Sequence, residues 1–401
     1  MPKHKFEIKI IVFSVPIVLS VAGTLVLGEW TIGTNDLHPM TDDLHPMTDD
    51  LYPMTDNNIT LSVIIPVRNE SQHIGEVLDR LLEQDYFAER FEILVVDGFS
   101  ADNTREIVRQ YAEQHSNIRL FENPKQVSSA ARNIGIEQSR GNIVLIIDGH
   151  CLIENGAMFK NIESAFERSQ ADCLGRPQPL EMIGATTLQW AIAFARRSLL
   201  GHHPDSFIYS GQAQYSPAIS VAVAYRKEVF ERVGLFDETF DACEDVEMNH
   251  RIDKAKLRCY FDPAIAVHYV PRKTLTGLMF QMNRYGRGRV KLFRKHRETF
   301  SLKSFGLGFF VLGVIFGFVF CWFHPVLFYV YFSILGFYIF TVLAESVRIT
   351  ILNRRLGVLF FLPIVFAAIH FGFGFGILRE FLGGAKKHHR GISNNSEFTK
   401  S

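Results

Sequence analysis

Residues 61–70 read LSVIIPVRNE, a run of apolar residues that ends on a polar stretch. The apolar part predicts a buried β-strand that stops at Val67. Residues 71–84 then predict an amphipathic helix with Ser71 at its N-cap and an apolar face made of Ile74, Val77, Leu78, Leu81 and Leu82. The segment is therefore a strand–helix unit.

The same alternation continues along the chain. The runs FEILVVD at 91–97 and NIVLIID at 142–148 predict further buried strands, and residues 102–114 predict another amphipathic helix. Continuous apolar strands that alternate with such helices are typical of a parallel sheet with helices on both faces. We therefore predict an α/β fold for a domain at residues 61–300.

Three carboxylates stand out against this pattern. Asp97 and Asp148 each close a predicted strand, and Asp245 lies in the polar segment ACEDVEMNHR. Ligands of open α/β sheets bind at the carboxyl ends of the strands. Two acids there, with a third that acts separately, suit an enzyme that holds a nucleotide and its metal while another group takes a proton.

Composition limits the alternatives. The chain has 401 residues and no formal net charge, with 47% hydrophobic residues. This length predicts two or three units, and the charge balance argues against a nucleic-acid partner. The five cysteines show no paired spacing, so we expect a reducing compartment and no disulfide framework.

Two features precede the α/β domain. Residues 10–28 are uncharged and follow three lysines, which predicts a retained hydrophobic anchor at 1–30, with a signal peptide as the rival interpretation. Residues 36–56 contain three near-identical heptapeptides, DLHPMTD twice and DLYPMTD once. Their Pro and Asp residues predict an extended linker at 31–60, and a metal site at His38 and His45 is the alternative.

The chain after residue 300 is membrane-like. Apolar runs at 305–323, 326–344 and 356–378 predict transmembrane helices within 301–385, followed by a polar tail at 386–401. A basic cluster beside the first span predicts the cytoplasmic side and a contact with lipid head groups or with the phosphates of a lipid-linked substrate. The cluster contains Arg284, Arg287, Arg289, Lys291, Arg294, Lys295 and Arg297.

Four motifs in order resemble those of family 2 glycosyltransferases with the GT-A fold of nucleotide-diphospho-sugar transferases. They are LSVIIPVRNE, LVVDGFSADNT, NIVLIIDGH and ACEDVEMNHR. The flanking AARNIGI and QMNRYGRGR are most similar to the membrane-bound glucosyltransferases of succinoglycan-type exopolysaccharide synthesis. The resemblance covers residues 61–297 and implies a GT-A domain with a mostly parallel sheet.

The resemblance assigns residues to the nucleotide. It places Pro66, Arg68 and Glu70 near the uridine, and it makes Asp97 the acceptor of a hydrogen bond from uracil. Arg132 would approach the phosphates, although a structural role for this helix residue is an equal alternative. Asp102 is expected to be the N-cap of the next helix.

The resemblance also implies a divalent cation. Asp148-Gly149-His150 occupies the place of the family's D-x-D motif, so Asp148 would contact ribose and metal and His150 would bind the metal. Histidine in place of the second acid shifts the preference toward Mn²⁺, with Mg²⁺ the alternative. The alternative is that His150 is a polar residue at the strand end whose hydrogen bonds are made within the protein.

The remaining motifs concern the acceptor. Asp245 matches the general base of the family's Glu-Asp motif, with Glu244 beside the substrates and positioning the helix. Gln281 and Arg284 match the Q-x-x-R-W signature, with Tyr285 replacing Trp. They would help to hold the acceptor and the diphosphate, and the absence of Trp argues against a processive polymerase.

We expect an inverting, metal-dependent enzyme of the cell (inner) membrane with a cytoplasmic catalytic domain. It would transfer glucose or a related hexose from a UDP-sugar to a lipid-linked saccharide or polysaccharide acceptor, alongside polysaccharide-assembly partners. A nucleotidyltransferase is an alternative, but the chain lacks a Gly-rich, Lys-containing phosphate loop. A non-catalytic scaffold is another, against which the intact Asp97, Asp148 and Asp245 argue.

Overall fold

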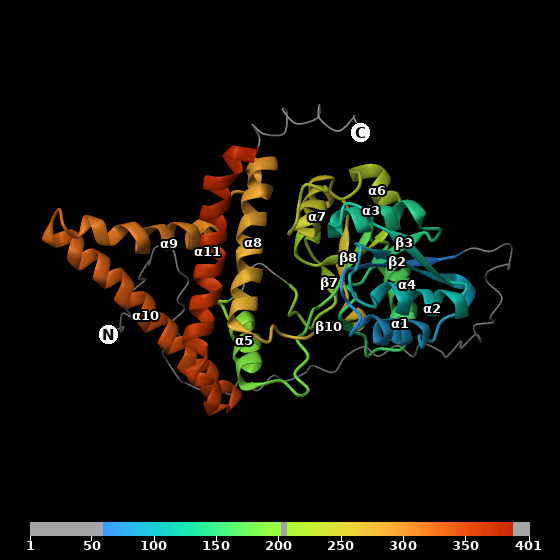
Figure 1. The fold of residues 1–401 in the computed structure, drawn as a ribbon, viewed down its shortest axis with the longest axis horizontal. Helices are drawn as coiled ribbons and strands as arrows, with labels where there is room; N and C mark the ends of the chain where they lie inside the picture. Colours follow the sequence, from blue (N-terminus) through green and yellow to red (C-terminus); the bar gives the residue numbers. More distant parts are fainter. Residues whose placement is uncertain (1–58, 202–206, 388–401) are drawn as a thin grey trace, which may run out of the picture. The chain divides into compact units, whose positions relative to one another are not determined.

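A computed structural model of the chain describes residues 59–201 and 207–387, which belong to one compact unit. The predicted anchor at 1–30, most of the linker at 31–60 and residues 388–401 of the polar tail lie outside the described residues. Figure 1 shows the arrangement of the described elements.

The domain is built on a mixed, mostly parallel sheet with the strand order β3-β2-β1-β4-β8-β6-β9-β7. Strands β3, β2, β1 and β4 run parallel, whereas β8 is antiparallel to both β4 and β6. A separate antiparallel pair joins β5 and β10. The strands are β1 (Leu61–Val67), β2 (Phe91–Asp97), β3 (Ile118–Glu122), β4 (Ile143–Ile146), β5 (Cys151–Leu152), β6 (Cys173–Gly175), β7 (Gln214–Tyr215), β8 (Ala222–Arg226), β9 (Cys259–Phe261) and β10 (His268–Tyr269).

Helices cover both faces of this sheet, as the sequence predicts. The α-helices are α1 (Ile74–Leu82), α2 (Thr104–Gln114), α3 (Ser128–Gln138), α4 (Met158–Ser169), α5 (Thr187–Arg197), α6 (Glu228–Val233), α7 (Glu244–Lys254), α8 (Leu275–Lys295), α9 (Leu302–Phe320), α10 (Pro325–Asn353) and α11 (Leu362–Lys387). The short 3₁₀ segments are η1 (Ala88–Arg90), η2 (Ala218–Ser220), η3 (Pro263–Ile265), η4 (Arg297–Thr299) and η5 (Leu356–Phe360).

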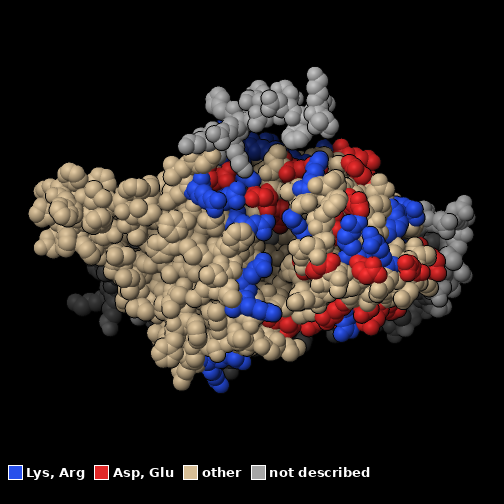
Figure 2. All heavy atoms as spheres, viewed as in Figure 1, with Lys and Arg blue, Asp and Glu red and all other residues tan. Residues whose placement is uncertain are grey.

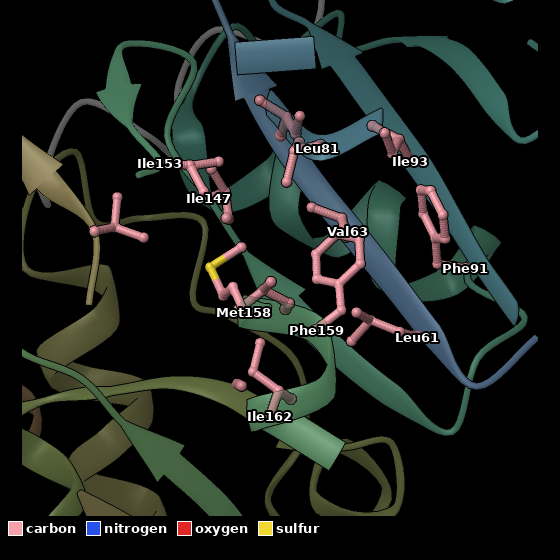
Figure 3. Packing of buried hydrophobic residues seen from close by; sticks show 14 of the residues in the cluster. Leu61, Val63, Leu81, Phe91, Ile93, Ile147, Ile153, Met158, Phe159 and Ile162 are labelled. Carbon is pink, nitrogen blue, oxygen red and sulfur yellow. The ribbon is translucent and has the colours of Figure 1, made fainter. Parts of the chain in front are cut away.

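The alternation of side chains along β1 divides the core into two layers. Val63 and Ile65 pack with α1, α2 and α4, a layer that Figure 3 shows around Val63 and Phe159. Ile64 packs on the opposite face with α3, α6 and α7. Both faces of β1 and β2 are buried, which explains why these strands read as continuous apolar runs.

The order of the strands places the site. The chain adds β2 and β3 on one side of β1 and β4 on the other, so the strand order reverses between β1 and β4. A crevice forms at such a reversal, beyond the carboxyl ends of the strands. Asp97 and Asp148 therefore come to the same edge of the sheet.

The C-terminal helices differ in detail from the three predicted runs. Residues 356–360 form η5, and the third helix begins at Leu362 with Pro363 in its first turn, where proline fits without a kink. The glycines of α11 do not interrupt it: a Cβ atom at Gly376 would collide with the backbone of Asn283, so they let α8 and α11 pack closely. Figure 1 shows these two helices side by side.

Within residues 59–201 and 207–387, two helices are long and apolar enough to cross a membrane: residues 325–353 and 362–383. The apolar part of α9, Phe305–Phe320, is shorter. Figure 2 shows that the surface over most of the α9–α10 hairpin carries no Lys, Arg, Asp or Glu on the visible face. The charged surface lies over the other elements.

Candidate active site

The turns after β1 and β2 lock together at the sheet edge. Asn69 adopts a left-handed conformation with φ 59° and bonds to the 100–101 turn through its backbone N–H and its side-chain oxygen. Asp97 is 1% exposed and accepts hydrogen bonds from the backbone and the hydroxyl of Ser100, while Arg105 lies 3.6 Å away. The carboxylate of Asp97 thus stabilises its own turn as well as facing the edge.

Two predicted N-caps differ in the structure. Helix α1 begins at Ile74 with His73, not Ser71, at its N-cap. Asn103 is the N-cap of α2, while Asp102 accepts from the backbone and the hydroxyl of Thr104 and from the backbone N–H of Ser71. Asp102 therefore ties the β1 turn to the start of α2.

The predicted uridine residues separate into three environments. Pro66 lies within β1 and pairs in register with Val96. The exposed Arg68 bonds to Gln126 at 2.8 Å. Glu70 turns to the other side, where its Oε1 lies 3.0 Å from Nδ1 of His150.

Asp148 and His150 follow β4 and lie close to this glutamate. Oδ2 of Asp148 accepts a hydrogen bond from the Tyr269 hydroxyl at 3.0 Å. The hydrogen bond that Glu70 accepts from Nδ1 of His150 raises the pKa of His150; burial opposes this effect and the nearby Asp148 adds to it. Gly149 is required between the two ligand candidates, since a Cβ atom there would lie 2.8 Å from Cγ1 of Val67.

These residues fit a divalent cation. With Nδ1 of His150 bonded to Glu70, its Nε2 has no partner among the described residues, and neither has Oδ1 of Asp148. A carboxylate that bonds one ring nitrogen of a histidine and orients the other toward a metal is a common second-shell arrangement. One imidazole nitrogen and one carboxylate oxygen suit Mn²⁺ better than Mg²⁺.

Arg132 of α3 lies between the two acidic motifs. It is 9% exposed, contacts Oε1 of Glu244 at 3.1 Å and stacks on Phe236. Burial lowers the pKa of Arg132, but Glu244, Asp245 and Asp148 together raise it above its usual value. Its neighbour Asn133 has a structural role, because its side chain bonds the backbone of Phe236 in both directions.

Asp245 is the second residue of α7 and is exposed. Its carboxylate bonds the N–H of Val246 at 2.8 Å and has no ion-pair partner among the described residues. Asp245 is therefore positioned as an available base, next to Glu244 and the buried Arg132.

The α8 motif reaches the site through Tyr285. Gln281 donates to the Tyr285 hydroxyl at 3.3 Å, and its own Oε1 is buried without a partner among the described residues. Burial raises the pKa of Tyr285, with Arg196 opposing and Asp245 adding to the effect, so this tyrosine lies near the candidate base. Arg284 of α8 is exposed and donates to the carbonyl of Asp241, so its side chain contacts the loop before α7.

Much of the basic cluster forms ion pairs within this chain. Acids of this chain neutralise four of its members, because α8 packs against both α11 and the loop before α7. The pairs are Arg287 with Asp241 and Glu380, Lys291 with Asp241, Arg294 with Glu380, and Lys295 with Asp237 and Glu247.

The sequence did not reveal Tyr269 and Arg176. Both contact the Asp148 region, Tyr269 directly and Arg176 through the tyrosine hydroxyl at 3.4 Å. They lie at the ends of β10 and β6, strands of two and three residues that leave no periodic pattern. A search for buried arginines would have required the structure.

Known proteins share both the sequence and the fold. The model of glycosyl transferase family 2 matches residues 62–234. The succinoglycan biosynthesis protein ExoA of Rhizobium meliloti (strain 1021) is 31% identical over 244 residues, which cover 60% of this chain and 72% of the relative.

A second relative matches over a longer stretch of the chain. The dolichyl N-acetyl-alpha-D-glucosaminyl phosphate 3-beta-D-2,3-diacetamido-2,3-dideoxy-beta-D-glucuronosyltransferase of Methanococcus voltae is 26% identical, covering 81% of this chain and 98% of the relative. The solved mannosyltransferase PcManGT from Pyrobaculum calidifontis, in complex with GDP-Man and Mn²⁺, has a TM-score of 0.51 at 18% identity over 83% of this chain and 90% of that chain. The chain therefore belongs to glycosyltransferase family 2 and is a glycosyltransferase of polysaccharide or glycan biosynthesis with the GT-A fold.

Proposed function

We propose that this enzyme transfers a hexose, glucose or a close relative, from a UDP-sugar to a lipid-linked saccharide with inversion at the anomeric carbon. The observation that carries the proposal is the placement of Arg132 between the Asp148–His150 pair and the exposed Asp245. One side of this arrangement suits a nucleotide diphosphate, and the other suits a hydroxyl that must lose its proton.

Each residue has a distinct task in this transfer. Asp97 and the turn after β1 hold the uracil end of the donor. Asp245 takes the proton of the acceptor hydroxyl as the general base. The acceptor oxygen then bonds to the anomeric carbon as the bond from that carbon to the diphosphate oxygen breaks, and the diphosphate leaves with the electron pair.

Arg132 stabilises the negative charge that accumulates on the leaving diphosphate. A divalent cation bound by Asp148 and His150 would neutralise more of that charge, and the imidazole favours Mn²⁺. Because the acceptor oxygen approaches the anomeric carbon from the face opposite the nucleotide, a single displacement converts an α-linked donor into a β-linked product.

Two relatives support the acceptor class by their names. The Rhizobium meliloti protein belongs to succinoglycan biosynthesis, and the Methanococcus voltae enzyme is named for a dolichyl phosphate-linked sugar. The mannosyltransferase of known structure was solved with a nucleotide sugar and Mn²⁺. A lipid-linked acceptor also agrees with an enzyme that carries apolar C-terminal helices.

We further propose a cytoplasmic catalytic domain at residues 61–300, joined by the 31–60 linker to the 1–30 anchor. Helices α9 and α10 would enter the cell membrane as a hairpin, since only 6% of the apolar window of α10 is buried by protein. Helix α11 is half buried, and its Glu380 pairs with Arg287 and Arg294. Such a helix fits the membrane surface, which keeps the tail on the cytoplasmic side.

A panel of UDP-sugars tests the function on purified full-length enzyme with a membrane lipid extract as acceptor. We expect turnover with one hexose donor and a loss of about 10²–10⁴-fold in kcat for Asp245→Asn, with UDP binding retained. Full activity in Asp245→Asn would exclude Asp245 as the base. A wild-type enzyme that is inactive with every donor would contradict the transfer itself.

A further inference from the structure

Tyr269 is anchored on both sides next to the candidate metal ligands. It pairs in register with Cys151, three residues after Asp148. Its backbone N–H donates to the carbonyl of Pro179 at 3.0 Å, and its carbonyl accepts from the N–H of Glu181 at 2.9 Å. The strand β10 is only two residues long, but these contacts fix the direction of the Tyr269 side chain.

The hydroxyl of Tyr269 reaches Oδ2 of Asp148 at 3.0 Å, and its ring packs edge-on to His150. Asp148 is thereby held by one oxygen, while Oδ1 has no hydrogen-bond partner in the part of the chain that the structure describes. A ligating carboxylate with one oxygen fixed loses rotational freedom before the ligand arrives.

Arg176 determines which way this hydrogen bond runs. Its guanidinium is 1% exposed, and its Nη2 lies 3.4 Å from the Tyr269 hydroxyl. Arginine can only donate, so the tyrosine oxygen accepts from Arg176 and directs its own proton to Asp148. Nε and Nη1 of Arg176 are buried without hydrogen-bond partners among the described residues.

A buried arginine with two unused donors is costly, and such a group in a native structure calls for an explanation. Within the described residues Arg176 has no ion-pair partner at contact distance. The nearest anionic group reached by its hydrogen bonds is Asp148, through Tyr269. The hydrogen bonds through Tyr269 give the buried Arg176 a role in orienting Asp148.

We propose that Tyr269 is a positioning residue for Asp148 in the binding of the metal and the donor diphosphate, and that Arg176 fixes the direction of the tyrosine hydroxyl. This inference rests on the proposed function in one respect, namely that a divalent cation and a nucleoside diphosphate bind at Asp148. It does not depend on the sugar or the acceptor.

The test is Mn²⁺ binding by the purified full-length protein in the presence of UDP, measured from the electron paramagnetic resonance signal of free Mn²⁺. Tyr269→Phe removes the hydroxyl and keeps the ring beside His150. We expect the dissociation constant of Mn²⁺ to rise by about 10–100-fold, the range for lost second-shell contacts. The kcat at saturating Mn²⁺ should return close to that of the wild type.

Tyr86→Phe is the matched control, because the Tyr86 hydroxyl also bonds a carboxylate, Glu163 at 3.1 Å, but away from the site. It should leave Mn²⁺ binding unchanged. Arg176→Met should weaken Mn²⁺ binding less than Tyr269→Phe does, and Arg176→Lys should restore part of the loss. A purely structural role predicts instead a lower unfolding temperature with unaltered Mn²⁺ affinity.

The outcomes separate this inference from the proposed function. A change of less than twofold in the Mn²⁺ dissociation constant of a folded Tyr269→Phe variant overturns the positioning role. Wild-type protein that binds no Mn²⁺ with UDP overturns it as well. Protein that binds Mn²⁺ and UDP and shows the Tyr269 effect, yet transfers no sugar from any donor, refutes the proposed transfer and supports the positioning role.

Discussion

The sheet edge that bears Asp148 and the loop that leads to Asp245 are built in different ways. Asp148 follows a strand buried on both faces, and residues of the α/β domain itself hold its surroundings. Asp245 follows an irregular loop whose last residue, Cys243, has φ 63°. That loop rests on α8, where a Cβ atom at Gly288 would lie 2.5 Å from Sγ of Cys243.

The ion pairs also differ in which elements they join. Those near the sheet edge, Asp97 with Arg105 and Glu70 with His150, join parts of the α/β domain, whereas Asp241 of the loop before α7 pairs with Arg287 and Lys291 of α8. Helix α8 in turn packs on α11, which is long and apolar enough to cross a membrane. The surroundings of Asp148 thus depend on the sheet. The position of Asp245 depends instead on how the α/β domain packs against its C-terminal helices.

Arg132 joins the two regions, so its replacement should have the largest effect. Arg132→Met removes the cation that we propose faces the diphosphate, and it leaves Glu244 buried without its partner. We expect kcat to fall by about 10²–10³-fold, as for loss of a transition-state donor. Breaking a buried pair also costs about 3–5 kcal/mol, so the unfolding temperature should drop clearly.

The double variant Arg132→Met/Glu244→Met separates these two effects. Replacing both charges with apolar groups of similar size should recover most of the unfolding temperature, because no buried charge is left unpaired. Turnover should stay low. Recovery of turnover together with stability would show that Arg132 serves the fold and not the diphosphate.

The fold around Asp97 and Asp148 could be predicted from the sequence because each of its strands and helices leaves a local sequence pattern. The apolar runs that end at Val67, Asp97 and Asp148 report burial on both faces of a parallel sheet, and the order of the strands then brings their ends together. The two candidate membrane helices were also evident from length and hydropathy. The contact of Glu70 with His150 was not, since it joins turns 80 residues apart.

The surroundings of Asp245 could be predicted only in part. The Glu-Asp motif marks Asp245, but the sequence gives no sign that α8 supports the loop in front of it. A basic helix next to apolar runs has the same pattern whether its cations meet lipid or protein. Only the fold shows that Lys291 and Arg287 face Asp241. Nor does the motif that contains Arg284 reveal that this side chain donates to the carbonyl of Asp241.

Gly288→Ala tests whether α8 positions the base. The added methyl group must displace Cys243 or the carbonyl of Ala242, and such overpacking costs about 1–3 kcal/mol. A shift of the base by a fraction of an ångström should lower kcat by about tenfold. The affinity for UDP and Mn²⁺, measured by calorimetry, should stay the same.

Gly306→Ala on α9 is the control, because a Cβ atom there meets nothing within 4 Å. It should change neither kcat nor the affinity for UDP. An equal loss of UDP affinity and kcat in Gly288→Ala would mean that the two regions are not separately supported. The positions of Asp148 and Asp245 would then depend on the same contacts.

The smallest effect concerns pH and the ion pairs between the loop and α8. Burial raises the pKa of Asp241 and of Glu247, but Lys291 acts on Asp241, and Arg251 with His296 acts on Glu247, so that both values end below the usual range. A carboxylate with a lowered pKa in the folded protein contributes stability above its unfolded pKa of about 4 and loses it as the pH falls through the folded value.

We therefore expect the unfolding temperature of the full-length enzyme in detergent to be level from about pH 7 to pH 5 and to fall below about pH 4. Lys291→Met should lower it by a few degrees at pH 7, with the difference from wild type shrinking as Asp241 becomes protonated. Lys160→Met, which breaks an exposed pair with Asp85, should have no such effect. A deficit in Lys291→Met that is constant from pH 7 to pH 3 would point to lost packing of the lysine stem, because a lost charge pair must disappear once its acid is neutral.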